Sequence, residues 1–147
     1  MSFCNWHKWK DRSQIENSEF PGVYMISITN KNLKGKPNYN DVSYIGMTNL
    51  QKLKSRWTQF DNSIRGKKWH SGGIRVYNEF GNYDSWKENL FVCAMPIKCN
   101  PKKAMRTPED LRLMGECAYL EYEAIARFKE KAKRSKRKLE EPEYNKK

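Results

Sequence analysis

The sequence lacks any apolar segment long enough to cross a membrane. No hydrophobic run in the chain approaches the roughly 20 residues that a membrane-spanning helix needs. The opening residues also lack the apolar core of a secretory signal, because Trp6-His7-Lys8-Trp9 mixes aromatic and polar side chains. We therefore expect no membrane partner and a cytoplasmic, intracellular location.

Cysteine and histidine are scarce, which limits the crosslinks and metal sites that the chain can form. The four cysteines are widely scattered, so in an intracellular protein we expect reduced thiols. Cys93 and Cys117 fall on apolar faces and are predicted to be buried. A zinc site made by Cys4, His7, Cys93 and Cys99 is a minor alternative, because neither Cys-x-x-His nor Cys-x5-Cys is a typical zinc spacing.

Acidic residues are outnumbered. The chain has 17 Asp and Glu against 29 Lys and Arg, which gives a formal net charge of +12. The positive electrostatic field of such a chain attracts polyanions and speeds their association with the protein. Nucleic acid is the usual partner of such a chain, and an anionic membrane surface is the alternative. The length of 147 residues predicts one domain with appendages.

The apolar pattern predicts a small α+β domain built on three strands. The β-rich runs are residues 23–29, 42–45 and 90–95, and the first two form a hairpin with a long loop. Helices are expected from Thr48 or Asn49 to Phe60 or Ile64, over 74–80 after a glycine-rich loop at 66–73, and from Pro108 onward. We expect a mixed or antiparallel sheet flanked by helices, with a long C-terminal helix. The domain would span 20–128, between an N-terminal arm (1–19) and a basic helical extension and tail (129–147).

Glu121 breaks the pattern of the last helix. At 100° per residue it falls near the middle of an apolar arc. That arc consists of Leu113, Met114, Cys117, Ala118, Leu120, Ala124, Ile125 and Phe128. A carboxylate aimed at a core is costly unless it is paired, protonated or bound to a cation. One interpretation is an ion pair, for example with Arg56, or an acid that reaches solvent at the edge of the core. The other is a metal ligand.

Two short strings in the predicted hairpin each place a tyrosine beside a glycine: Gly22-Val23-Tyr24 and Tyr44-Ile45-Gly46. With Arg56 on the following helix and Glu121 on the last one, they resemble the motifs of the GIY-YIG nucleases. The resemblance covers residues 21–121. In the acidic helix segment of that family the second glutamate binds the metal, which selects Glu121 over Glu116. Asn145 stands where the family has a closing asparagine.

The resemblance implies cleavage of a DNA strand with Mg²⁺ or Mn²⁺ as cofactor. Tyr24 or Tyr44 would activate the water, Arg56 would contact the scissile phosphate and Glu121 would hold the metal. His70, similar to a histidine of phage-type and restriction-type members, would assist. The alternatives are ordinary strand tyrosines, a solvated helix arginine and a loop histidine.

The positive charge also predicts where DNA binds. The expected contacts lie in the glycine-rich loop and in the basic tail, at Lys67, Lys68, Lys133 and Arg134. The five tryptophans are expected either in the core or stacked on bases. A homodimer that cuts both strands is possible. The competing functions are a structure-specific repair nuclease, a non-catalytic nucleic-acid-binding module, and a membrane-surface or protein-interaction domain.

Overall fold

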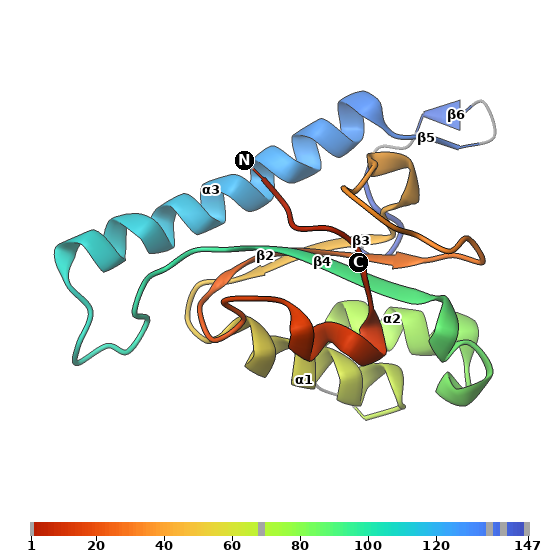
Figure 1. The fold of residues 1–147 in the computed structure, drawn as a ribbon, viewed down its shortest axis with the longest axis horizontal. Helices are drawn as coiled ribbons and strands as arrows, with labels where there is room; N and C mark the ends of the chain where they lie inside the picture. Colours follow the sequence, from red (N-terminus) through yellow and green to blue (C-terminus); the bar gives the residue numbers. More distant parts are fainter. Residues whose placement is uncertain (1, 68–69, 135–136, 139–140, 146–147) are drawn as a thin grey trace.

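Figure 1 shows the computed structural model, which describes residues 2–67, 70–134, 137–138 and 141–145. Its centre is a four-stranded antiparallel sheet in the order β1-β4-β2-β3. The strands are β1 (His7–Lys8), β2 (Gly22–Ile28), β3 (Tyr44–Thr48) and β4 (Leu90–Pro96). The α+β class and the hairpin of β2 and β3 are therefore confirmed. The sheet is antiparallel throughout, with β3 at one edge.

The prediction of three strands was wrong by one short strand. β1 comes from the predicted N-terminal arm and pairs with β4, with His7 opposite Val92. Two residues are too few to show the alternation of apolar and polar side chains that predicts a strand, so no pattern in the sequence indicated β1. The same segment is anchored by burial, because Phe3, Trp6 and Trp9 all lie in the core. The segment predicted to be an arm thus packs against the sheet.

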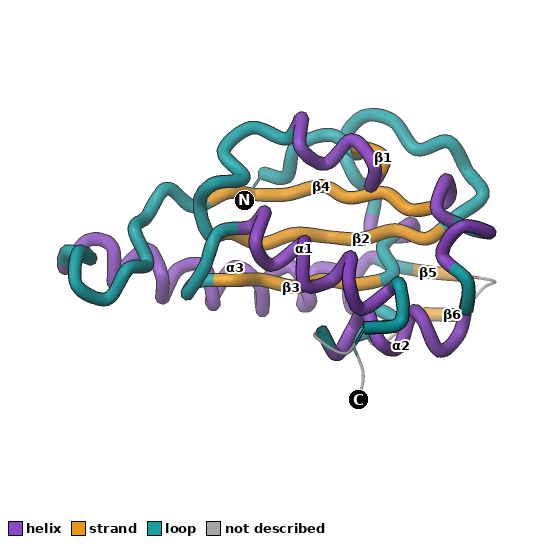
Figure 2. Tube along the Cα trace, turned by 90° about the horizontal axis from the view of Figure 1, so that it is seen from below, coloured by secondary structure: helices purple, strands orange, loops and turns teal. Residues whose placement is uncertain are grey.

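Helices cover both faces of the sheet (Figures 1 and 2). One face carries the 3-10 helix η1 (Trp9–Gln14) and the helices α1 (Leu53–Ile64) and α2 (Ser71–Phe80). The other face carries α3 (Pro108–Lys131). Because side chains alternate along a strand, Tyr24 and Ile26 of β2 pack in the α1 and α2 layer, whereas Val23 and Met25 pack in the α3 layer.

The two helices of the first layer begin at other residues than expected. α1 begins at Leu53 rather than near Asn49, because Thr48 still belongs to β3 and Leu50 is 71% exposed. α2 begins at Ser71, so the prediction of a loop over 66–73 was wrong for residues 71–73, which are helical. α2 ends as expected at Gly81, whose φ of 69° suits a residue without a side chain.

α3 begins at the predicted residue and ends earlier than expected. Thr107 caps it, and Asp110 completes a reciprocal capping box. The helix stops at Lys131, and the next residues form the short pair β5 (Lys133–Arg134) and β6 (Arg137–Lys138). The predicted basic helical extension was therefore wrong. Beyond Phe128 the sequence has no apolar stripe left to hold a helix against the sheet.

Buried aromatic and sulfur side chains complete the core. Trp6, Trp9, Trp57 and Trp86 are all buried, which favours the core interpretation, while Trp69 lies outside the described residues. The four cysteines are free thiols, and Cys93 and Cys117 are fully buried as expected. No helix in the described parts of the chain combines the length and the hydropathy needed to cross a membrane.

Candidate active site

The structure brings the five predicted residues together at the edge strand β3. Tyr24 comes from β2, Tyr44 from β3 and Arg56 from α1, and His70 caps α2. The rings of Tyr24 and Tyr44 lie 6.0 Å apart, and those of Tyr44 and His70 lie 5.5 Å apart. Glu121 approaches from α3, on the other face, and acts electrostatically on Tyr44. Side chains of both layers can meet here because β3 has no neighbour strand on its outer side.

Two glycines make room for the ring of Tyr44. A β-carbon on Gly46 would lie 2.6 Å from Cε2 of Tyr44 and 2.7 Å from the hydroxyl of Tyr24. A β-carbon on Gly72 would lie 2.6 Å from Cε1 of Tyr44. All three distances are shorter than non-bonded heavy atoms tolerate. The glycine of the second motif therefore serves a steric purpose, and so does a glycine that the sequence placed in a loop.

His70 holds Tyr24 by a buried hydrogen bond of 3.0 Å between Nε2 and the tyrosine hydroxyl. Its Nδ1 accepts a hydrogen bond from the main-chain N–H of Gly73 at 3.2 Å, as the cap of α2. Burial and the nearby Arg56 and Arg75 lower the pKa of His70 to about 3, so the ring is neutral at pH 7. A neutral ring that accepts at Nδ1 carries its proton on Nε2. We therefore assign His70 as the donor and the Tyr24 oxygen as the acceptor.

This assignment leaves the hydroxyl proton of Tyr24 free to point toward Tyr44. Among the described residues, His70 is the hydrogen-bond partner of the Tyr24 hydroxyl, and Tyr44 and Arg56 are close enough to shift its pKa. Burial raises the pKa of Tyr24 well above its ordinary value, and Tyr44 raises it further. Burial also raises the pKa of Tyr44, and Glu121 adds to this rise. Arg56, the hydrogen-bonding influence of Tyr24 and the charge of Arg75 oppose the rise in pKa. Tyr44 is thus the easier of the two to deprotonate.

Arg56 is the cation of the site. Its Nη1 donates to Oε1 of Gln59 at 3.0 Å, one helical turn away on α1. Its buried Nε–H has no hydrogen-bond partner among the described residues. The role of Gln59 was not predicted from the sequence, although its i+3 spacing places it beside Arg56 on the helix surface. An unpaired, buried N–H costs about 1–3 kcal/mol, so a ligand oxygen that accepted from it would recover part of this cost.

Glu121 is half-buried, as its place in the apolar arc predicted. Burial raises the pKa of its carboxyl group, and Arg56 opposes the rise. Its carboxylate forms no ion pair or hydrogen bond with the described part of the chain, so the proposed ion pair with Arg56 is an attraction at longer range. Glu116, the other glutamate of the motif, is exposed.

The donor set suits a metal that needs few protein ligands. No group of three or more His, Cys, Asp or Glu residues gathers anywhere in the described chain, so no such group supports the zinc alternative there. A single partnerless carboxylate fits Mg²⁺ or Mn²⁺ better, because such ions often take one or two carboxylates and complete their shell with water and substrate phosphates. Glu121 is therefore a suitable ligand for the implied metal.

Asn145 holds the outer edge of β3. Its side-chain oxygen accepts from the N–H of Ile45 at 2.7 Å, and its amide nitrogen donates to the carbonyl oxygen of Ile45 at 2.6 Å. The N–H of Tyr144 bonds to the carbonyl oxygen of Ser43. Asn145 thus takes the place of a neighbouring strand beside Tyr44, and it stabilises the site without entering it.

The predicted DNA contacts lie in the segment before α2 and in the segment after α3. Lys67 is exposed just before α2, and Lys68 lies outside the described residues. Lys133 and Arg134 lie in β5 rather than on a helix. Comparisons with protein-family models, with curated proteins and with solved structures found no match.

Proposed function

We propose that this protein is a metal-dependent DNA endonuclease of the GIY-YIG type, which hydrolyses a phosphodiester bond. The observation that carries the proposal is Glu121. It is a half-buried carboxylate with no direct partner in the described chain, and it acts on Tyr44 and Arg56. A protein that only bound DNA would gain nothing from placing a partly desolvated acid next to a phosphate site.

Tyr44 is the better candidate for the residue that takes the proton of the attacking water. It is 8% exposed, whereas Tyr24 is fully buried. To act as a base, Tyr44 first loses its own proton to solvent, and its oxygen gives up the resulting negative charge when it takes the proton of the water. His70 donates to Tyr24, and Tyr24 can donate to the deprotonated Tyr44 oxygen. Arg56 also stabilises the negative charge on the deprotonated Tyr44 oxygen. His70 and Tyr24 are therefore positioning residues that stabilise the deprotonated form of Tyr44.

Arg56 would bind the phosphate that reacts. Gln59 holds one end of the guanidinium group, and the free Nε–H leaves a donor for a non-bridging oxygen. The positive charge also opposes the negative charge that develops on the phosphate. When bound at Glu121, a divalent ion supplies further positive charge for the phosphate and for the leaving 3′ oxygen.

DNA is the proposed substrate because the chain carries a net charge of +12 and exposes Lys67 beside α2. Binding that depends on phosphate contacts weakens steeply with salt. A homodimer that cuts both strands remains part of the proposal, because one chain offers one such cluster for one strand.

The test is incubation of supercoiled plasmid, and of branched and single-stranded DNA, with Mg²⁺, Mn²⁺ or EDTA. We expect cleavage only with a divalent metal. Glu121→Gln should lower the rate at least about 10²-fold and leave DNA affinity within a few-fold of the wild type. Glu116→Gln, on the exposed face of the same helix, should cleave normally.

Equal cleavage by E121Q and E116Q would contradict the role of Glu121. If the wild type binds DNA but cuts none of the substrates with either metal, the protein is a nucleic-acid-binding module. If it cuts only branched DNA, it is a structure-specific nuclease.

A further inference from the structure

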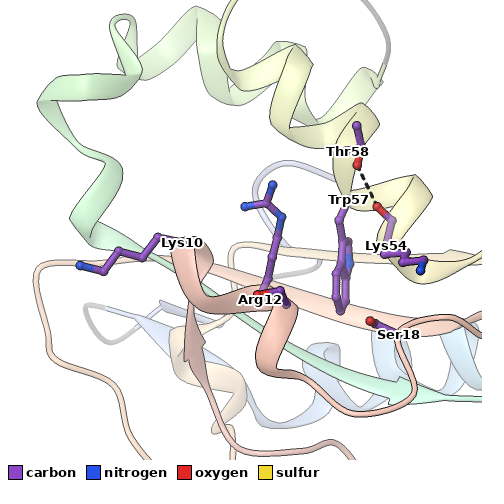
Figure 3. Close-up of a pocket in the computed structure, with 7 residues that line it drawn as sticks. Lys10, Arg12, Ser18, Lys54, Trp57 and Thr58 are labelled. Atoms are coloured by element: carbon purple, nitrogen blue, oxygen red, sulfur yellow. Dashed lines mark hydrogen bonds between the residues drawn. The ribbon is translucent and has the colours of Figure 1, made fainter.

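A basic pocket lies between η1 and α1 (Figure 3). It has a volume of about 460 Å³. Lys10 and Arg12 line it from η1, Lys54 lines it from α1, and the indole of Trp57 forms one wall. Ser13 and Ser18 add side-chain hydroxyl groups, and none of the lining residues is acidic. The pocket therefore combines cationic groups with hydrogen-bond donors.

The pocket and the tyrosine cluster lie on opposite flanks of α1. Leu53, Trp57 and Phe60 face the core. At 100° per residue, Lys54 projects to one side of this core-facing stripe and Arg56 projects to the other side. The Trp57 ring separates the two regions, because it lines the pocket and also packs edge-on against Tyr24 at 6.3 Å. A ligand that passes over α1 can contact both flanks.

The walls of the pocket are fixed by contacts between η1 and α1. Trp9 packs against Trp57, with ring centres 6.5 Å apart, and its indole N–H donates to Asp61 at 2.8 Å. Arg12 lies over the Trp9 ring at 4.4 Å. The main-chain N–H of Lys54 donates to the carbonyl oxygen of Ser18 at 3.0 Å. A pocket ordered in advance loses little entropy when a ligand binds.

The cations of the pocket differ in how far they are neutralised. Lys10 pairs with Glu88, and Arg12 lies 3.8 Å from Asp61. Lys54 takes part in none of the ion pairs that the described residues form. The Nε1–H of Trp57 is buried and unpaired within the same residues. An oxyanion in the pocket would neutralise Lys54 and lie against the Trp57 indole.

We propose that this pocket binds a phosphate oxyanion. This part of the inference rests on the proposed function: the oxyanion is a backbone phosphate of the bound nucleic acid. A helix with its side chains is about 10–12 Å across. Phosphates follow one another at about 3.4 Å along the axis of a duplex strand. Successive phosphates are further apart in space than along the axis, so the phosphate in the pocket would lie only a few nucleotides from the one held at Arg56.

The first test measures binding of a labelled duplex oligonucleotide in EDTA at several salt concentrations. Loss of one phosphate contact lowers the slope of log affinity against log salt by about 0.9. We expect this decrease for Lys54→Gln. Lys34→Gln removes the same charge from an exposed residue of the loop between β2 and β3 and should leave the slope unchanged, because its neighbour Leu33 packs in the α3 layer on the other face of the sheet. Equal slopes for K54Q and wild type would overturn the nucleic-acid assignment.

The second test uses inorganic phosphate and the indole N–H signals of the ¹⁵N-labelled protein. Trp57→Phe assigns the Trp57 signal by its disappearance. Phosphate should shift this signal in the wild type and in K34Q, with a weaker response in K54Q. No shift at any phosphate concentration would overturn the oxyanion site itself. A shift together with an unchanged salt slope would show an oxyanion site that does not serve nucleic acid.

Both tests are independent of catalysis, because neither requires a metal. Loss of the salt-slope difference with normal plasmid cleavage would refute only the role of the pocket in binding nucleic acid. A normal salt-slope difference with no cleavage by the wild type would refute the proposed reaction alone.

Discussion

The two flanks of α1 use polar groups in different ways. On one flank, Tyr24 and His70 are buried, uncharged at pH 7 and bonded to each other. On the other flank, Lys10 and Lys54 are exposed cations around an open pocket. The buried groups can set the direction of a proton, because each has a fixed partner. The exposed groups can attract an anion, but solvent screens them. The difference separates a region suited to chemistry from a region suited to binding.

The largest expected effect concerns the neutral state of His70. An unfolded histidine has its ordinary pKa near 6.5, whereas the folded one has a pKa of about 3. Between these two pKa values only the unfolded chain binds the proton. The free energy of unfolding therefore keeps its full value above the pKa of the unfolded histidine and falls as the pH decreases below it. From pH 7 to pH 4 this contributes a loss of about 3 kcal/mol.

Urea unfolding of the wild type and of His70→Asn at pH 7 and pH 4 measures that loss. Asparagine can still cap α2 but does not titrate. The free energy of unfolding should fall less in H70N than in the wild type, while His7→Asn should follow the wild type. An equal fall in H70N and the wild type would show that His70 is not buried in the neutral form.

A smaller effect is expected when the space beside Tyr44 is filled. Gly46→Ala places a β-carbon against both tyrosine rings, and such overpacking costs about 1–3 kcal/mol. Displacement of the rings should also lower cleavage up to about 10²-fold. Gly115→Ala on α3 is the matched control, because its β-carbon would meet no atom within 4 Å. That variant should be neutral or more stable by up to about 1 kcal/mol.

Thermal unfolding and plasmid cleavage measure the two glycine variants. If G46A matches G115A in both assays, the two tyrosines are not confined as the structure indicates, and the contrast between a fixed and an open flank fails.

The smallest effect is expected at the edge of β3. Asn145→Ala removes two hydrogen bonds to Ile45, and water can replace part of them, so the loss should be about 1 kcal/mol. Hydrogen exchange of the Ile45 amide should become faster, whereas the amide of Met25 in the central strand β2 should keep its protection. Unchanged exchange at Ile45 would show that Asn145 does not hold the strand beside Tyr44.

Much of this arrangement was predictable from the sequence because its signals are local. The β-rich run of β2, the Thr107-Pro108 start of α3 and the misplaced Glu121 each depend on residues close together in the chain. β1 was missed because a two-residue strand exists only through its pairing with β4. The end of α3 was missed because lysine and arginine favour a helix, whereas burial of Ala132 in extended backbone ends it.

The details of the site that were missed depend on contacts distant in sequence. Gly72 is required by the ring of Tyr44, which lies in another strand. The proton position on His70 follows from Gly73 on one side and Tyr24 on the other. The basic pocket forms only when η1 packs on α1. No periodicity or motif contains such information, because it arises from tertiary packing.

The most direct measurement compares metal-dependent plasmid cleavage by the wild type, Tyr44→Phe and Tyr24→Phe under single-turnover conditions. Phenylalanine preserves the ring packing and removes only the hydroxyl group. We expect Y44F to lose at least about 10²-fold in rate, since general-base catalysis contributes that much or more. Y24F should lose less, because it removes a positioning group. Cleavage by Y44F at the wild-type rate would contradict the account.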